Sequence, residues 1–238
     1  MNDHTRYVVI TGITKGIGYA IARRFAQEGM GLIGCSRHAG DLEAMKDELD
    51  VLHPDLPVHL IPTDLSVPHE VDTFAQYVQS ITEAPAVLVN NAGIFQPGGI
   101  LDEQPGVLER TMQINLYSAY HLTRHLVPGM VRQGNGHIFN LCSVASLQAY
   151  AGGSTYAITK FAMLGFSRSL RAELKDTGLR VTSLIPGATW SDSWSGADLP
   201  PDRLMDAEDI AALVWTSFSL RSPAVVEEIL IRPQLGDL

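Results

Sequence analysis

Short apolar runs alternate with longer amphipathic stretches along the chain, and this alternation constrains the fold more than any other feature. Strands that alternate with helices of ten or more residues form right-handed crossovers and a parallel sheet. Uniformly apolar strands indicate that both faces of the sheet are covered. The pattern predicts one doubly wound α/β domain over residues 1–238, with helices on both faces of about seven strands. Strands are expected at 7–10, 31–35, 58–61, 86–89, 136–142, 179–185 and 227–231, and helices at 17–28, 41–52, 68–81, 106–131, 155–177 and 207–220.

Composition and charge exclude several classes of protein. The net charge of -9 argues against a nucleic-acid partner. The chain contains no run of about 18 apolar residues, so no membrane span is predicted. Its first residues lack the pattern of a signal peptide. The two cysteines, Cys35 and Cys142, are expected to be buried thiols in a reducing compartment, which favours a cytoplasmic protein. His121 and His125 have the spacing of metal ligands but no evident third ligand, so no metal is predicted.

A glycine-rich turn joins the first expected strand to the first expected helix. Gly12 suits a tight turn, Gly16 lets the backbone approach a pyrophosphate, and Gly18 allows close packing of the helix. The start of the helix offers free N–H groups and a partial positive charge to phosphates. Glycine triplets alone are common in turns. Their place between a strand and a helix favours a dinucleotide-binding site.

The order of the motifs resembles the short-chain dehydrogenase/reductase family. The glycines have the spacing G-x-x-x-G-x-G, Asn90-Asn91-Ala92-Gly93 follow the fourth strand, and Tyr156-x-x-x-Lys160 begins a later helix. Asn115, Ser143 and Pro186-Gly187 also stand where the family pattern expects them, so the resemblance spans nearly the whole chain. It implies cofactor contacts from Gly12, Thr14, Lys15, Gly16, Ile17, Gly18, Arg37, Asp64, Leu65, Asn91, Ala92, Gly93, Tyr156, Lys160, Pro186 and Gly187.

The end of the second strand indicates which dinucleotide is used. Sites for NAD usually carry an Asp or Glu here, whereas this chain has Arg37 and no carboxylate before Asp41. A guanidinium suits the oxygens of a 2′-phosphate, and Lys15 extends toward the same region. In the family, basic residues at these two places accompany NADP(H). Asp64 resembles the residue that contacts the adenine amino group, and it is also a candidate helix N-cap.

Tyr156 and Lys160 stand four residues apart, so they share a helix face. A nearby ammonium is expected to lower the pKa of the tyrosine toward the working pH. The resemblance implies that hydride passes from the nicotinamide to a carbonyl carbon while Tyr156 protonates the oxygen. It further implies that Lys160 tunes Tyr156 and binds the ribose, that Ser143 orients the substrate, and that Asn115 holds a water in a proton path.

Substrate identity rests on fewer residues. Phe95, Ala145 and Tyr150 flank the expected catalytic loops, and Trp190 and Trp194 lie in the irregular stretch 187–205, which is a candidate lid. The end of the chain and Trp194 resemble bacterial sepiapterin-reductase-like members of the family. A pterin ketone and a generic ketone or aldehyde both remain open as substrates.

Two other functions remain open, and the resemblance also bears on how subunits assemble. A 3-oxoacyl-acyl-carrier-protein reductase would need a basic rim for its acidic carrier, and Arg124, Arg132, Arg168 and Arg171 are candidates, although the net charge opposes it. A cofactor-sensing protein without turnover usually lacks the catalytic tyrosine or lysine, which are both present here. The resemblance also implies a homodimer or homotetramer through the helices that carry Asn115 and Tyr156.

Overall fold

A seven-stranded parallel sheet forms the centre of the computed structural model, which describes residues 5–191, 198–200 and 202–237. The strand order is β3-β2-β1-β4-β5-β6-β7, and all six neighbouring pairs are parallel. The predicted doubly wound α/β fold is therefore confirmed. The strands are β1 (Tyr7–Thr11), β2 (Gly31–Ser36), β3 (Val58–Pro62), β4 (Val87–Asn90), β5 (Gly136–Leu141), β6 (Leu179–Pro186) and β7 (Glu228–Ile231).

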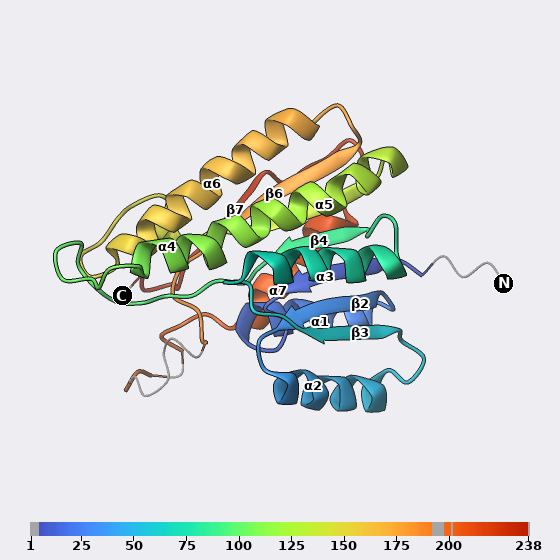
Figure 1. Ribbon diagram of the computed structural model, residues 1–238, viewed down its shortest axis with the longest axis horizontal. Coiled ribbons are helices and arrows are strands. Elements are labelled where there is room, and N and C mark those ends of the chain that lie inside the picture. The colour runs from blue at the N-terminus through green and yellow to red at the C-terminus, as the bar shows by residue number, and fades with distance from the viewer. Residues whose placement is uncertain (1–4, 192–197, 201, 238) are drawn as a thin grey trace.

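Helices cover both faces of this sheet, as Figure 1 shows for α3 and α5, which cross in front of the strands. One apolar core lies between the sheet and α1, α2 and α7, and the second lies between the sheet and α3, α5 and α6. Val8 and Val9 of β1 point into opposite cores, which explains why the strands are apolar throughout. The helices are α1 (Gly16–Gln27), α2 (Ala39–Leu52), α3 (Pro68–Ile81), α4 (Val107–Met112), α5 (Ser118–Gln133), α6 (Ser154–Leu174) and α7 (Ala207–Ser219).

The expected single helix over 106–131 is wrong in one respect. A π-helical turn, η1 (Gln113–Tyr117), separates α4 from α5. Asn115 lies in this turn, where its side-chain amide forms hydrogen bonds to the backbone of Ile94 and to Thr159. The wider turn accommodates Asn115 without ending the helix. Single π-helical turns of this kind are commonly found inside α-helices.

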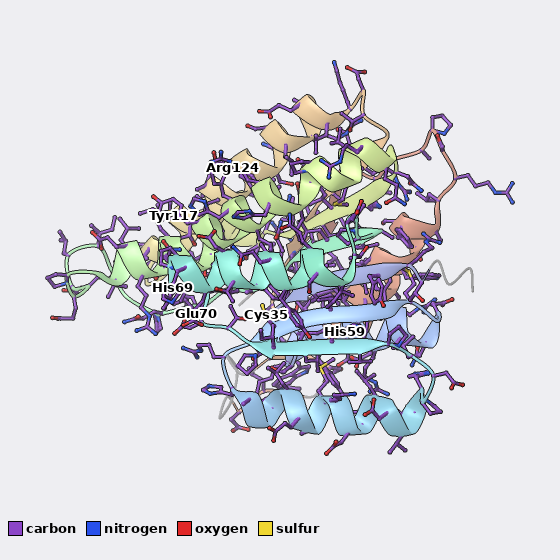
Figure 2. The ribbon with its side chains drawn as sticks, turned by 45° about the vertical axis from the view of Figure 1, so that its right-hand side comes forward. Cys35, His59, His69, Glu70, Tyr117 and Arg124 are labelled. Carbon is purple, nitrogen blue, oxygen red and sulfur yellow. The ribbon has the colours of Figure 1, made fainter. Side chains whose placement is uncertain are left out.

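The strand order places a crevice at the carboxyl ends of β1 and β4. The chain leaves β1 toward β2 and β3 on one side, and returns to β4, β5, β6 and β7 on the other. Such a switch point is where doubly wound folds bind ligands. Cys35 lies near this end of β2, inside the fold (Figure 2), and Cys142 follows β5; both thiols are buried and free. Within the described residues, no helix combines the length and apolarity that crossing a membrane requires.

Candidate active site

The glycine-rich turn has the tight geometry that its sequence predicts. Gly12 has φ +67°, a left-handed conformation that side-chain-bearing residues rarely adopt. A Cβ on Gly18 would lie 2.3 Å from the carbonyl oxygen of Gly12, so only glycine lets α1 approach the turn this closely. Asn91 braces the arrangement, because its Nδ2 donates to the carbonyls of Thr11 at 2.8 Å and Gly12 at 3.0 Å.

Thr11 ties the ends of β1 and β4 together and is a site residue that the sequence interpretation missed. Its Oγ1 accepts hydrogen bonds from the backbone N–H groups of Asn91, at 3.1 Å, and Ala92, at 3.0 Å. The position of this threonine at the end of the first strand was the available signal. The two loops that flank the crevice are thereby held at a fixed separation.

A cleft of about 510 Å³ opens between these two loops. Four residues expected to contact the cofactor do not line this cleft. Pro186 and Gly187 line a second cavity, and Gly18 and Lys160 are buried. The cleft gathers most of the side chains expected to contact the cofactor: Gly12, Thr14, Lys15, Gly16, Ile17, Arg37, Asp64, Leu65, Asn91, Ala92, Gly93 and Tyr156.

The charged groups of the cleft lie at its β2 end. Arg37 is exposed there, and Lys15 Nζ lies 3.6 Å from Asp41. Burial alone would raise the pKa of Asp64. Hydrogen bonds from Ser66 and the charges of Arg37 and Arg110 outweigh burial and hold that pKa below its usual value. Asp64 therefore stays ionised, and it accepts the backbone N–H of Ser66 in a turn. The expectation that it caps a helix is wrong, because Val67 is the N-cap of α3.

Lys160 is buried beneath the crevice, with 3% of its surface exposed. Its Nζ donates to the carbonyl oxygen of Leu141 at 2.7 Å and lies 5.5 Å from the centre of the Tyr156 ring. Burial disfavours the ammonium and lowers the pKa of Lys160 from 10.5 to about 8. The amine therefore titrates near pH 8, on the face of the Tyr156 ring.

This lowered pKa makes the stability of the fold depend on pH. Between pH 8 and 10.5 the unfolded chain binds a proton that the folded chain has lost, so the free energy of unfolding rises with pH in that window. The rise amounts to about 3 kcal/mol, because each pKa unit is worth about 1.4 kcal/mol. Urea unfolding of the wild type and of Lys160→Met should therefore diverge between pH 8 and 10.5, the wild type gaining.

The matched control is Lys46→Met, which removes an exposed lysine paired with Asp50. Its free energy of unfolding should follow the wild-type pH dependence through the same window. Parallel curves for the wild type and Lys160→Met would contradict the assignment of the lowered pKa to this lysine.

Tyr156 lies between the cleft and a second cavity, and it lines both. The expected lowering of its pKa is wrong for this state of the protein. Burial raises the pKa of Tyr156, and only the hydrogen bond from Ser143 opposes that effect. The reason is packing: Phe95 meets the Tyr156 ring edge-on, with the ring centres 5.2 Å apart, and restricts its contact with water. Tyr156 is thus held protonated, in the form that donates a proton.

Ser143 follows β5 and is buried beside Tyr156. Its Oγ accepts the N–H of Ala145 at 3.1 Å, and its own N–H donates to Ser146 Oγ at 3.1 Å. The serine therefore caps the short helix η2 (Val144–Ser146). A hydroxyl carries one hydrogen and two lone pairs, so Oγ retains a donor for another oxygen while it caps.

Asn115 is fully buried in η1, below the loop after β4. Its Oδ1 accepts the N–H of Ile94 at 2.8 Å, and its Nδ2 donates to Ile94 O and to Thr159 Oγ1, both at 3.0 Å. Both amide hydrogens are used, which leaves one lone pair on Oδ1. A Cβ on Gly93 would lie within 3.5 Å of both Asn115 Oδ1 and Lys160 Nζ, so the two polar groups face the same small region.

The second cavity, of about 460 Å³, lies on the other side of Tyr156. Phe95, Tyr150 and Gln148 line it, with Ser143 at its inner wall. Ala145 does not line the cavity: it is buried in η2, where its N–H donates to Ser143. Trp194 lies outside the described residues. Trp190, also expected in the pocket, is not among the residues that line this cavity; its backbone N–H donates to Met205 O at 2.9 Å and joins the two described ends of the stretch 187–205.

The end of the chain contributes two residues to this cavity that the sequence interpretation did not assign to it. Arg232 Nη1 and Asp237 Oδ2 form an ion pair of 3.1 Å, and both side chains line the cavity. Arg203 holds the same segment in place, because its guanidinium donates to Gly236 O at 2.9 Å and Asp237 O at 3.2 Å. The sequence marked the end of the chain only as a subfamily resemblance, and its place in the cavity depends on contacts with Arg203, more than 30 residues earlier. We call residues 232–237 the tail wall.

Comparison with known proteins places this arrangement among its relatives. A family model described as short chain dehydrogenase matches residues 6–198. Sepiapterin reductase from Chlorobaculum tepidum is 34% identical over 239 residues, covering 97% of each chain. L-Sorbose reductase from Gluconobacter frateurii, complexed with NADPH and L-sorbose, superposes with a TM-score of 0.88 at 26% identity, over 96% of this chain and 95% of that one. A metagenomic short-chain oxidoreductase in complex with NADP gives 0.84 at 28% identity, over 96% and 97%.

Proposed function

The chain belongs to the short-chain dehydrogenase family, and on that premise we propose that it is an NADP(H)-dependent oxidoreductase that interconverts a carbonyl group and an alcohol. One observation carries the proposal: Tyr156 lines both the dinucleotide-sized cleft and the smaller cavity, with Ser143 beside it and Lys160 beneath it. A proton donor at the junction of two cavities suits a reaction between two bound molecules.

The residues of the cleft fit a dinucleotide phosphate. The turn at Gly12 and the start of α1 direct free N–H groups at the pyrophosphate position. Arg37 and Lys15 line the cleft near the end of β2, where they would hold the 2′-phosphate of NADP(H), and Asp64 would meet its adenine. NADPH and NADP are the ligands of the related structures named above. When bound, the nicotinamide supplies or accepts the hydride.

The catalytic side chains divide the remaining work. Tyr156 donates its phenolic proton to the oxygen of the carbonyl, and the single O–H of Ser143 holds that oxygen in place of Tyr156. Lys160, which titrates near pH 8, stabilises the phenolate that is left. Asn115 fixes the loop at Ile94 and keeps Oδ1 near Lys160 Nζ, so it positions the groups through which the proton is restored.

We propose a small ring-bearing ketone as the substrate, with a pterin ketone as the first candidate. Phe95 and Tyr150 place aromatic rings in the wall of the cavity, which suits a flat ring. Asp237 is a carboxylate acceptor for ring N–H groups, which a pterin carries and a simple ketone lacks. The identity of 34% to a sepiapterin reductase over nearly the full length supports this choice.

The carrier-protein alternative has weaker support. Arg168 and Arg171, two of the four arginines considered for a basic rim, form ion pairs with Glu228 and Glu227. Arg132 lines a hollow beside Ala86, at the opposite edge of the sheet from the cavity. These arginines do not form a basic rim around the cavity.

A carbonyl panel followed by NADPH absorbance tests the substrate. Sepiapterin should be reduced with kcat/KM at least about tenfold above that of an acetoacetyl carrier thioester, because the cavity is built for a flat ring. L-Sorbose and simple aldehydes complete the panel. A higher kcat/KM on the thioester would overturn the substrate proposal, and binding of NADPH without turnover of any carbonyl would favour a cofactor-sensing protein.

The helices expected to join subunits present apolar and aromatic side chains outward. Tyr117 and Arg124 project from η1 and α5 in Figure 2, and Tyr117 and Tyr120 are more than 40% exposed. Ile158 and Phe161 of α6 are exposed to a similar extent. Side chains of this kind are enriched at subunit interfaces. They support a homodimer or homotetramer through these helices.

A further inference from the structure

The edge of the sheet opposite the active site contains a hollow of about 690 Å³. Ala86 and Leu179, at the start of β4 and β6, line it, whereas Pro186 at the other end of β6 lines the active-site cavity. Eight strand residues separate the two sites by more than about 20 Å. We call this feature the amino-edge hollow.

Four of the 17 basic residues of the chain line the amino-edge hollow: Arg6, Arg171, Lys175 and Arg180. Within the described part of the chain, none of its lining residues is an Asp or Glu, although the chain carries 26 acidic residues. Random placement on a chain with net charge -9 would bring carboxylates to such a surface. The hollow therefore has a positive potential that runs against the charge of the whole protein.

Individual contacts account for part of this charge but leave an excess. Arg180 donates to the carbonyls of Ser217, Phe218 and Leu220 at the end of α7, and Arg171 pairs with Glu227. A helix end contributes only about half a negative charge. Among the described residues, Arg6 and Lys175 have no carboxylate within ion-pair distance. Both side chains belong to exposed residues and are available to a ligand.

The arrangement of Arg6 and Arg180 points in the same direction. Their guanidinium carbons lie 5.0 and 5.8 Å from the centre of the same Phe218 ring. Burial lowers the pKa of Arg180, and the positive charge of the nearby Arg6 adds to that effect. An anion between them would relieve this repulsion. Trp215 and Phe218 add apolar wall to the hollow, whose volume is in the range of ordinary ligand sites.

We propose that the amino-edge hollow is a second binding site, separate from the active site, for a small molecule that carries two or more negative charges. Phosphate and carboxylate groups are the chemistry that Arg6, Lys175 and Arg180 would recognise. The concave shape and aromatic wall favour a compact polyanion over an extended chain, which would need a continuous basic stripe.

Calorimetric titration with inorganic pyrophosphate tests this site, with the protein saturated with NADPH so that the glycine-rich turn is filled. Wild type should bind with a millimolar or tighter dissociation constant at low salt. Arg6→Gln combined with Lys175→Gln should weaken binding at least about tenfold, because two charged hydrogen-bond donors are lost. Both residues are exposed, so the variant should keep its turnover with NADPH.

The matched control combines Arg23→Gln with Lys46→Gln, two substitutions on α1 and α2 that remove the same charge from another surface. It should bind pyrophosphate like the wild type. The proposal fails if the NADPH-saturated wild type does not bind pyrophosphate up to about 10 mM, or if both double variants bind it equally. If NADPH did not fill the cofactor cleft and pyrophosphate bound there, both double variants would bind it equally. An error in the cofactor assignment would therefore count against the proposal and not for it.

Discussion

Replacing Tyr156 by phenylalanine should lower kcat/KM for carbonyl reduction by about 10²- to 10⁴-fold, the range that one general acid supplies. The ring would keep its edge-on contact with Phe95, so the walls of both cavities should stay in place. Only the phenolic proton would be lost. NADPH binding, followed by fluorescence, should remain within about twofold of the wild type, because the cleft keeps all its other residues.

Tyr150→Phe is the matched control for this prediction. Tyr150 lines the same cavity and is nearly half exposed, but the structure gives it no hydrogen bond with Ser143. Loss of the Tyr150 hydroxyl should change kcat/KM by less than about tenfold. If the Tyr156→Phe enzyme kept a tenth of the wild-type turnover, Tyr156 would not be the proton donor.

Replacing Arg37 by alanine should weaken NADPH binding by about 100-fold and leave NADH binding within about twofold. A charged hydrogen bond to phosphate is worth about 1.5–3 kcal/mol, which corresponds to a factor of about 10 to 150. NADH lacks the 2′-phosphate and so has nothing to lose. Arg37 is exposed at the rim of the cleft, so its removal should not disturb the fold.

Dissociation constants for both dinucleotides, measured on the same preparation, decide the point. Arg23→Ala serves as the control, because Arg23 carries the same charge on α1 but does not line the cleft. Equal weakening of NADPH and NADH by Arg37→Ala would rule out the assignment of the 2′-phosphate to this residue.

The sequence predicts most of this fold because its local patterns agree with its packing. Every expected strand ends within one residue of the observed one, since each strand is an apolar run bounded by turn residues. The π-turn at Asn115 could not be predicted in this way. It arises from hydrogen bonds to Ile94 and Thr159, which are 21 and 44 residues away along the chain.

The same division holds for the site. Lys160 and Tyr156 share a helix, so their proximity follows from their spacing. The direction of the Tyr156 pKa does not, because burial outweighs the hydrogen bond from Ser143 that opposes it. The place of Arg232 and Asp237 in the cavity was likewise not predicted, since Arg203, about 30 residues earlier, holds the tail wall.

The residues of the tail wall that line the cavity lie in a different part of the chain from the residues that transfer the proton. The groups that move the proton lie between residues 115 and 160, whereas Arg232 and Asp237 lie in the last strand-to-terminus segment. Substitutions in that short segment can reshape the cavity without altering the acid, its lysine or the cofactor cleft. Substrate preference can therefore change through substitutions in a few residues of the tail wall, while the residues that transfer the proton stay as they are.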